Sequence, residues 1–255
     1  MNETDTASLA PWIQYAQPVP GVRLVLLCIP HAGGSASSFR DWTTKLASRG
    51  IEVWPVQLPG RETRYNEPLL TDLGGMVKAL SDVVLPQLRD RPYAVFGHSA
   101  GSVMAYAFAR HAVAHGQPPP RHLFVSACRP PQHPDPDFPI HLLPDDRLLD
   151  RLVGYGRMPM EVLRYPDLTK SMINTARADL QLVETYPWPD DPALDCPVTA
   201  LGGLEDVDVP VHLLPDWRVI SRRRTESHTV PGGHFPEAAG QQRILEVVRR
   251  ALSEY

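Results

Sequence analysis

A serine between two glycines, at residues 97–101 (GHSAG), constrains this chain more than any other segment. The apolar run before it, residues 93–96, indicates a strand, and residues 102–110 after it have the composition of a helix. On such a tight strand-to-helix turn a base can reach the hydroxyl, which is otherwise a poor nucleophile at neutral pH. A β-carbon on either glycine would press on the neighbouring strand or helix. The segment therefore predicts a nucleophile elbow with Ser99 at its apex.

Strand-like and helix-like segments alternate around this elbow. Apolar runs predict strands at residues 23–29, 51–56, 93–96, 122–127, 197–201 and 226–230. Helical spacing predicts helices at residues 39–48, 69–88, 100–115 and 241–252, the second of them opened by Thr71 and Asp72 in capping position. This alternation is typical of an α/β fold, a mostly parallel sheet with helices on both faces. From about 130 to 187 no strand separates the helical segments, so we expect a helical insertion there, either a lid above Ser99 or ordinary packing.

Length and composition indicate a globular enzyme with one domain, residues 1–255. Hydrophobic residues make up 43% of the chain and charged residues 21%, which is ordinary for a folded protein. The formal net charge of −4 offers no basic surface, so we expect no nucleic-acid partner. The three cysteines have neither a close pair nor metal-finger spacing, so we expect no disulfide and no metal site.

Targeting signals are missing from the sequence as given. No apolar run approaches the length of a membrane span, and the first residues lack the basic and apolar regions of a signal peptide. We therefore expect no membrane association and a cytoplasmic location. A monomer is taken as the expected state.

A base and a carboxylate for the serine follow late in the chain. His234 lies in a glycine-rich turn, residues 231–235 (PGGHF), directly after the last expected strand. Asp206 comes just after the strand at 197–201, and we prefer it as the carboxylate over its loop neighbours Glu205 and Asp208. Serine, then aspartate, then histidine is the chain order of the α/β-hydrolase fold. The sequence therefore predicts Ser99, Asp206 and His234 as a catalytic set.

Acyl transfer through a serine also needs backbone N–H donors for the oxyanion of the tetrahedral intermediate. In an α/β-hydrolase one donor follows the nucleophile, here Ala100, and the other lies in the loop after an early strand. Residues 30–34 (PHAGG) form that loop, and we select Ala32 as the second donor and His31 as a residue lining the site. A plain Gly-Gly turn is the alternative interpretation of the loop.

Four segments together resemble the type II thioesterases, the stand-alone editing hydrolases of polyketide and nonribosomal peptide assembly lines. They are residues 30–36 (PHAGGSA), 58–62 (LPGRE), 97–101 and 231–235, and the similarity extends to residues 177–179 and 184–186. The resemblance implies a nucleophile at Ser99, a base at His234, a carboxylate at Asp206 and oxyanion donors at Ala32 and Ala100. Ala100 stands where the family often has methionine.

The resemblance also implies a substrate and a partner. The substrate would be an acyl thioester on the phosphopantetheine arm of an acyl or peptidyl carrier protein, and no cofactor is expected. Three methionines of the insertion, Met158, Met160 and Met172, are candidates for an adaptable acyl channel, with plain core packing as the alternative. Rival functions on the same fold are acyl transfer to an alcohol or amine, hydrolysis of small esters, and a non-catalytic carrier-binding module.

Overall fold

Six strands form one sheet in the computed structural model, which describes residues 9–156, 160–190 and 193–255. The order across the sheet is β2-β1-β3-β4-β5-β6, and every neighbouring pair is parallel. The strands are β1 (Leu24–Ile29), β2 (Ile51–Pro55), β3 (Tyr93–His98), β4 (Leu123–Ser126), β5 (Val198–Gly203) and β6 (Thr225–Val230). The expected strands are thus confirmed to within two residues at either end.

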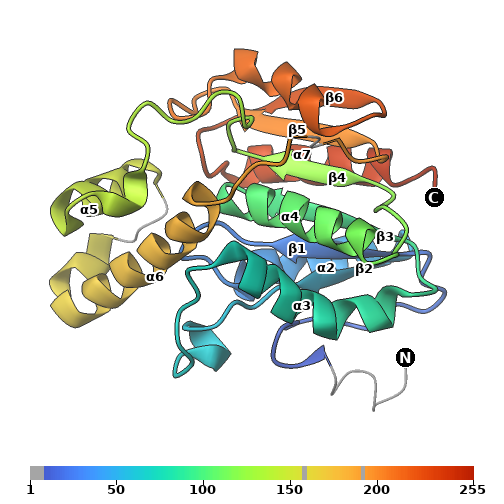
Figure 1. Ribbon diagram of the computed structural model, residues 1–255, viewed down its shortest axis with the longest axis horizontal. Helices are drawn as coiled ribbons and strands as arrows, with labels where there is room; N and C mark the ends of the chain where they lie inside the picture. The colour runs from blue at the N-terminus through green and yellow to red at the C-terminus, as the bar shows by residue number, and fades with distance from the viewer. Residues whose placement is uncertain (1–8, 157–159, 191–192) are drawn as a thin grey trace.

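Helices connect the strands and cover both faces of the sheet (Figure 1). The α-helices are α2 (Arg40–Ala47), α3 (Leu73–Leu88), α4 (Ala100–Ala114), α5 (Asp145–Gly154), α6 (Pro166–Glu184) and α7 (Ala238–Ala251). Short 3-10 segments are η1 (Ala36–Phe39), η2 (Glu62–Arg64), η3 (Ile140–Leu142), η4 (Met160–Arg164) and η5 (Val211–Ile220). In Figure 1, α3 and α4 lie in front of the sheet, whereas α2 and α7 lie behind it.

Strand β1 shows why helices cover both faces of the sheet. All six of its residues are buried. Val25, Leu27 and Ile29 pack with α3, α4 and η5, whereas Leu24 and the other alternate residues pack with α2 and α7. Successive side chains of a strand point to opposite faces, so a strand that is apolar throughout requires helices on both sides.

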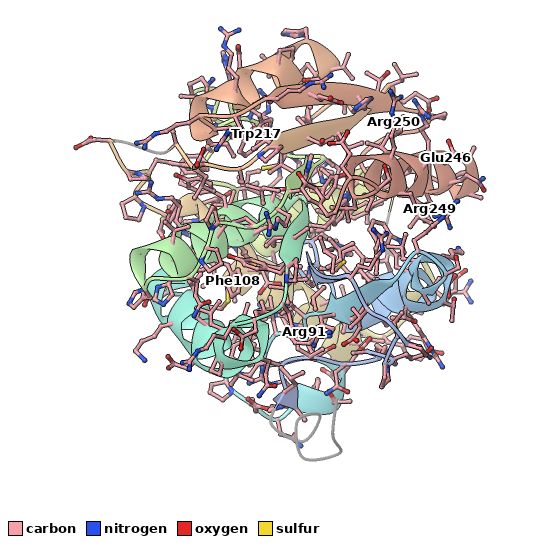
Figure 2. All side chains as sticks on the ribbon, turned by 90° about the vertical axis from the view of Figure 1, so that its right-hand side faces the viewer. Arg91, Phe108, Trp217, Glu246, Arg249 and Arg250 are labelled. Atoms are coloured by element: carbon pink, nitrogen blue, oxygen red, sulfur yellow. The ribbon has the colours of Figure 1, made fainter. Side chains whose placement is uncertain are left out.

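The burial of side chains on the covering helices agrees with this arrangement (Figure 2). Phe108 of α4 and Trp217 of η5 are fully buried, and Glu246 and Arg250 lie on the exposed side of the amphipathic helix α7. No helix in the described part of the chain has the length and apolarity needed to cross a membrane. All three cysteines are free thiols.

One expected helix begins later than its apolar pattern indicates. The pattern starts at Leu69, but α3 starts at Leu73, where the Asp72 carboxylate accepts the N–H groups of Gly74 and Gly75. Leu69 is half-buried and packs closely against Gly60, so its apolar contact is a tertiary one and not that of a helical face. The expected cap at Asp72 is therefore confirmed, whereas the expected start at residue 69 was wrong by about one helical turn.

The helical insertion lies between β4 and β5, as expected, and contains η3, α5, η4 and α6. In a parallel sheet, the loops that follow the strands all emerge at the carboxyl edge. The loops after β1, β3, β5 and β6 therefore meet at the same edge from which the insertion departs. The segments predicted to carry chemistry are consequently brought together by topology.

Candidate active site

Ser99 occupies a strained turn between β3 and α4. Its φ of 54° and ψ of −125° lie in a region that residues with a β-carbon rarely adopt. Its N–H donates to the Ser126 carbonyl at 2.7 Å, which ties the turn to the end of β4. A β-carbon at Gly97 would lie 2.1 Å from the Gly101 oxygen, and one at Gly101 would lie 2.3 Å from the Ile29 oxygen. Both glycines are therefore required for this backbone path.

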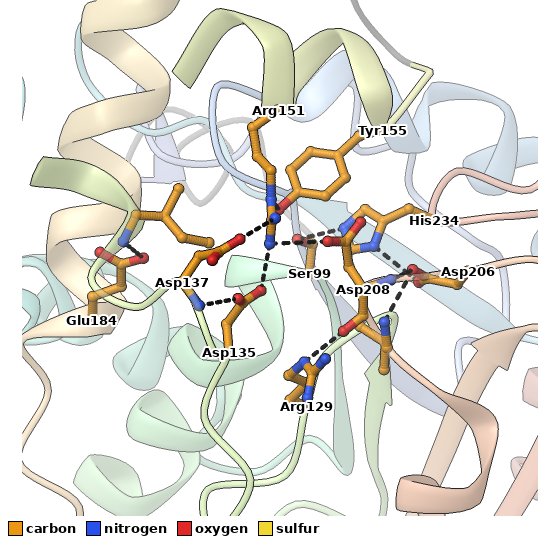
Figure 3. Close-up of polar contacts among 12 residues, drawn as sticks. Ser99, Arg129, Asp135, Asp137, Arg151, Tyr155, Glu184, Asp206, Asp208 and His234 are labelled. Atoms are coloured by element: carbon orange, nitrogen blue, oxygen red, sulfur yellow. Dashed lines mark hydrogen bonds and ion pairs between the residues drawn. The ribbon is translucent and has the colours of Figure 1, made fainter. Parts of the chain in front are cut away.

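Three polar side chains from separate loops form a continuous chain of hydrogen bonds (Figure 3). His234 Nε2 lies 2.9 Å from Ser99 Oγ, and His234 Nδ1 lies 2.9 Å from Asp206 Oδ2. Because a carboxylate only accepts, Nδ1 carries the proton that it donates to Asp206, which leaves Nε2 to accept the serine proton. The arrangement is thus competent to activate the Ser99 hydroxyl.

Asp206 is held in its ionised form by its neighbours. Burial raises the pKa of this carboxyl, but the bonds with His234 and with the N–H groups of Asp208 and Val209 outweigh burial, so the pKa lies below its ordinary value. The two N–H groups lie 3.0 and 3.1 Å from Oδ1. A negative charge is therefore fixed behind the imidazole.

The alternative carboxylates of this loop point elsewhere. Asp208 pairs with Arg151 of α5 at 2.9 Å, and burial raises the pKa of the Asp208 carboxyl. Glu205 is exposed. Of the three candidates in the loop, the structure brings Asp206 to His234.

The loop after β1 lies beside Ser99. His31 and Ala32 line a cavity of about 240 Å³ that contains the Ser99 side chain. Gly33, with φ of 73°, donates its N–H to Asp179 Oδ2 of α6 at 2.8 Å. Ala100, the other expected donor, is the first residue of α4, where backbone N–H groups have no partner within the helix.

Residues 61 and 62 hold this loop in place. The Arg61 guanidinium forms two hydrogen bonds of 2.8 Å with Asp179, and both side chains are almost completely buried. Glu62 accepts the hydroxyl groups of Ser35 and Ser37 at 2.6 and 2.7 Å. The LPGRE segment therefore anchors the loop that carries Ala32, and α6 supplies the carboxylate between them.

The insertion forms part of the wall of the cavity at Ser99. Its lining residues from α5 and α6 are Leu152, Tyr155, Met172, Ala176 and Leu180. Met172 is thus placed at the cavity as expected. Met158 lies outside the described residues, and so does the side chain of Met160, so both stay predictions.

Sequence reasoning missed several residues that contact the site. Tyr155 was not singled out, although its ring stacks on His234 with centroids 4.5 Å apart. Asp179 was noted only within a family-like segment, and its bond to Gly33 spans 146 positions of sequence. The apolar spacing of residues 172–182 indicated a helix with a buried face, but spacing alone does not show which residues face a cavity.

This chain is similar to known proteins over nearly its whole length. Linear gramicidin dehydrogenase LgrE of Brevibacillus parabrevis is 33% identical over 96% of this chain and 93% of its own length. The RedJ thioesterase from the prodiginine pathway of Streptomyces coelicolor superimposes with a TM-score of 0.85 at 32% identity, covering 93% of this chain and 94% of its own. The type II thioesterase BorB from the borrelidin biosynthetic cluster superimposes with a TM-score of 0.83 at 31% identity, covering 94% of this chain and 97% of its own.

A family model supplies the remaining comparison. The model of the thioesterase domain matches residues 25–252. This range includes all the proposed site residues and all six strands, apart from the first residue of β1. The overall likeness to RedJ and BorB extends through the insertion as well as the sheet, since both cover more than nine tenths of the chain. The chain belongs to the thioesterase domain family.

Proposed function

We propose that this protein hydrolyses acyl thioesters carried on the phosphopantetheine arm of acyl or peptidyl carrier proteins. The observation that carries the proposal is the Ser99–His234–Asp206 hydrogen-bond chain at a cavity partly lined by the insertion. Membership of the thioesterase family selects the thioester among the acyl compounds that such a chain can cleave. The biosynthetic relatives support a carrier protein as the partner.

The reaction follows from the contacts of the three side chains. Ser99 Oγ attacks the thioester carbonyl carbon while its proton passes to His234 Nε2. The carbon–sulfur bond breaks, and the imidazolium returns the proton to the sulfur, so the carrier leaves as a free thiol. Water then attacks the Ser99 ester with His234 as base, and the ester breaks to give the free acid and the regenerated hydroxyl. Asp206 orients the imidazole and balances its transient charge.

The negative oxygen of each tetrahedral intermediate requires fixed donors. We assign this role to the N–H groups of Ala32 and Ala100. The start of α4 contributes the positive end of the helix dipole at Ala100. The Gly33–Asp179–Arg61 contacts hold the loop at Ala32, so the donors are positioned before the substrate arrives.

The acyl group is placed in the cavity between α5 and α6. Leu152, Met172, Ala176 and Leu180 give this cavity an apolar wall, and His31 and Ser99 also line it. A volume of about 240 Å³ holds a short or medium acyl chain without rearrangement. Residues 130–187 would act as a lid, and the whole chain as one hydrolase domain that works as a cytoplasmic monomer.

A hydrolysis panel tests the substrate class. Carrier-bound acyl thioesters should be cleaved with a kcat/KM more than about tenfold above that for p-nitrophenyl esters of the same acyl groups. Free acid should remain the main product when alcohols or amines are added, whereas ester or amide formation would indicate an acyltransferase. Preference for the simple esters would indicate a small-ester hydrolase, and binding without turnover would indicate a carrier-binding module.

LgrE is named a dehydrogenase, which raises a second candidate function for this chain, that of an oxidoreductase. Dinucleotide-binding enzymes commonly hold the cofactor pyrophosphate with a G-x-G-x-x-G turn after a strand. This sequence contains no such spacing of glycines. Incubation of the protein with an acyl thioester and NADH or NADPH should therefore consume no cofactor. Cofactor oxidation coupled to aldehyde formation would overturn the hydrolase proposal.

A further inference from the structure

The imidazole of His234 is enclosed by aromatic rings as well as by its hydrogen-bond partners. The Tyr155 ring lies almost parallel to it, with an interplanar angle of 23° and centroids 4.5 Å apart. Phe235 meets it edge-on with centroids at 5.1 Å. Only 8% of His234 is exposed, although it belongs to a surface loop. A residue of the insertion therefore covers one face of the proposed base.

Tyr155 is itself contacted by the side chain of Arg151, one helical turn earlier in the chain (Figure 3). Arg151 Nε lies 3.4 Å from the Tyr155 hydroxyl oxygen, to which it donates. Burial raises the pKa of Tyr155 to about 12, so the hydroxyl stays neutral at physiological pH. The ring is thus fixed by α5 on one side and by His234 on the other.

Arg151 also connects α5 to the loop that carries Asp206. Its Nη2 atom lies 2.9 Å from Asp208 and 2.6 Å from Asp135, and its Nη1 atom lies 2.7 Å from Asp137. Asp208 is two residues after Asp206 and donates its backbone N–H to the Asp206 carboxylate. The guanidinium therefore joins the end of the insertion to the support of the His234–Asp206 pair.

We propose that Tyr155 is a positioning residue for His234, and that the Arg151–Asp208 ion pair sets its place. The proposal rests on the hydrolase function above. A base that must alternate between Ser99, the leaving sulfur and water has to keep its ring orientation in both protonation states. A stacked ring restricts rotation of the imidazole and excludes water from its face. The insertion thereby completes the catalytic centre as well as covering it.

A simpler role for Tyr155 is to line the substrate space. Its side chain borders both the cavity at Ser99 and a second cavity of about 500 Å³ on the Asp206 side. The two roles predict different kinetics. Loss of a cavity wall changes KM and the acyl-length preference, whereas loss of a positioning contact lowers kcat for every acyl group and slows all chemistry at Ser99.

The test compares Tyr155→Leu with Tyr155→Phe, which keeps the ring and loses the hydroxyl. Kinetics are measured on acetyl and octanoyl pantetheine thioesters, together with the rate at which a small fluorophosphonate probe labels Ser99. Tyr155→Leu should lower kcat and the labelling rate about 10-fold to 100-fold for both acyl lengths, with KM changed less than about threefold. Tyr155→Phe should restore both rates to within about threefold of wild type.

A second pair of variants tests the ion pairs of Arg151, the residue that contacts the Tyr155 hydroxyl. Asp208→Asn removes the ion pair with Arg151, whereas Asp137→Asn removes the 63%-exposed partner of the same guanidinium. The first should slow labelling of Ser99 by about 3-fold to 10-fold, and the second should leave labelling unchanged. This pair leaves the Tyr155 ring in the protein, so it remains informative if Tyr155→Leu does not fold.

The outcomes separate this role from the function on which it rests. Wild-type labelling rates in Tyr155→Leu, or equal effects of Asp208→Asn and Asp137→Asn, would overturn the positioning role. Labelling of the wild type without release of carrier-bound acyl groups would overturn the proposed function alone. A wild-type protein that the probe does not label would overturn both.

Discussion

Asp179 of α6 accepts the Gly33 N–H while it forms a two-bonded ion pair with Arg61, so one buried carboxylate joins the insertion to the loop beside Ser99. Asp179→Asn would leave the buried Arg61 charge without its partner, which costs about 3 to 5 kcal/mol of unfolding free energy. The loosened loop should also lower kcat about 10-fold to 100-fold. Urea unfolding and turnover at a temperature where the variant is folded measure both effects.

An exposed ion pair of similar length provides the matched control. Lys78 and Asp82 lie 2.7 Å apart on α3 with more than half of each side chain exposed. Asp82→Asn should change the unfolding free energy by less than about 0.5 kcal/mol, because solvent screens exposed pairs. Equal losses in the two variants would contradict the anchoring role of Asp179.

The glycines of the elbow should resist substitution. Gly101→Ala would place a β-carbon 2.3 Å from the Ile29 carbonyl oxygen, and we expect a loss of at least about 3 kcal/mol or failure to fold. Gly154→Ala is the control, since a β-carbon there meets nothing within 4 Å. That variant should be unchanged or stabilised by up to about 1 kcal/mol, because alanine is the better helix former. Thermal unfolding followed by circular dichroism measures the stability of both variants. A small loss of stability in Gly101→Ala would contradict the close approach of the Gly101 backbone to Ile29.

Asp206 and Glu205 are adjacent acids with different expected roles. Asp206→Asn should lower kcat by about 10⁴-fold, because an amide at this position stabilises the wrong histidine tautomer and supplies no charge. Glu205→Gln should stay within about twofold of wild type, since the exposed Glu205 side chain lies outside the hydrogen-bond chain. Single-turnover hydrolysis of an acyl pantetheine thioester distinguishes the two variants. Comparable losses of kcat in both would contradict the assignment of Asp206 as the catalytic carboxylate.

His122, at the start of β4, should make stability depend on pH. Burial lowers its pKa to about 4, against a smaller opposing effect of Glu226. In the unfolded chain His122 has the ordinary pKa of 6.5. Between pH 6.5 and about pH 4 the unfolded chain therefore binds a proton at His122 that the folded protein does not bind, so the free energy of unfolding falls as the pH drops through this range. The loss at about pH 4 should approach about 3 kcal/mol relative to pH 7.

A variant isolates the contribution of this histidine. His122→Gln keeps a partner for the Thr199 hydroxyl, which lies 2.8 Å from His122 Nε2, and removes the titration. Its unfolding free energy should vary less with pH between about 4 and 7 than that of the wild type. Urea unfolding across this pH range gives the comparison, and parallel curves for the two proteins would contradict the lowered pKa.

Local patterns in the sequence accounted for the sheet and for the meeting of the three proposed catalytic residues. The apolar runs at β1 and β3 and the glycine spacing around Ser99 are short-range signals, and each reflects a steric requirement that the structure shows. Parallel topology then places the loops after these strands at one edge. Ser99, Asp206 and His234 could therefore be predicted together although 135 positions separate the first from the last.

Contacts between the insertion and this edge could not be predicted in the same way. The ring of Tyr155 reaches His234 across 79 positions, and no periodicity encodes which turn of α5 ends over the imidazole. The start of α3 was placed too early for a related reason, since Leu69 packs against Gly60 and not on a helix face. Tertiary contact decides such details, and a single sequence does not state it.

In the proposed reaction, Ser99 carries the acyl group between the carrier thiol and water. Mass spectrometry of the protein, quenched during reaction with an acyl carrier protein thioester, tests this directly. We predict one acyl adduct on the peptide containing Ser99, accompanied by free acid, and neither adduct nor acid release with Ser99→Ala. Release of the acid by Ser99→Ala at the wild-type rate would contradict the account.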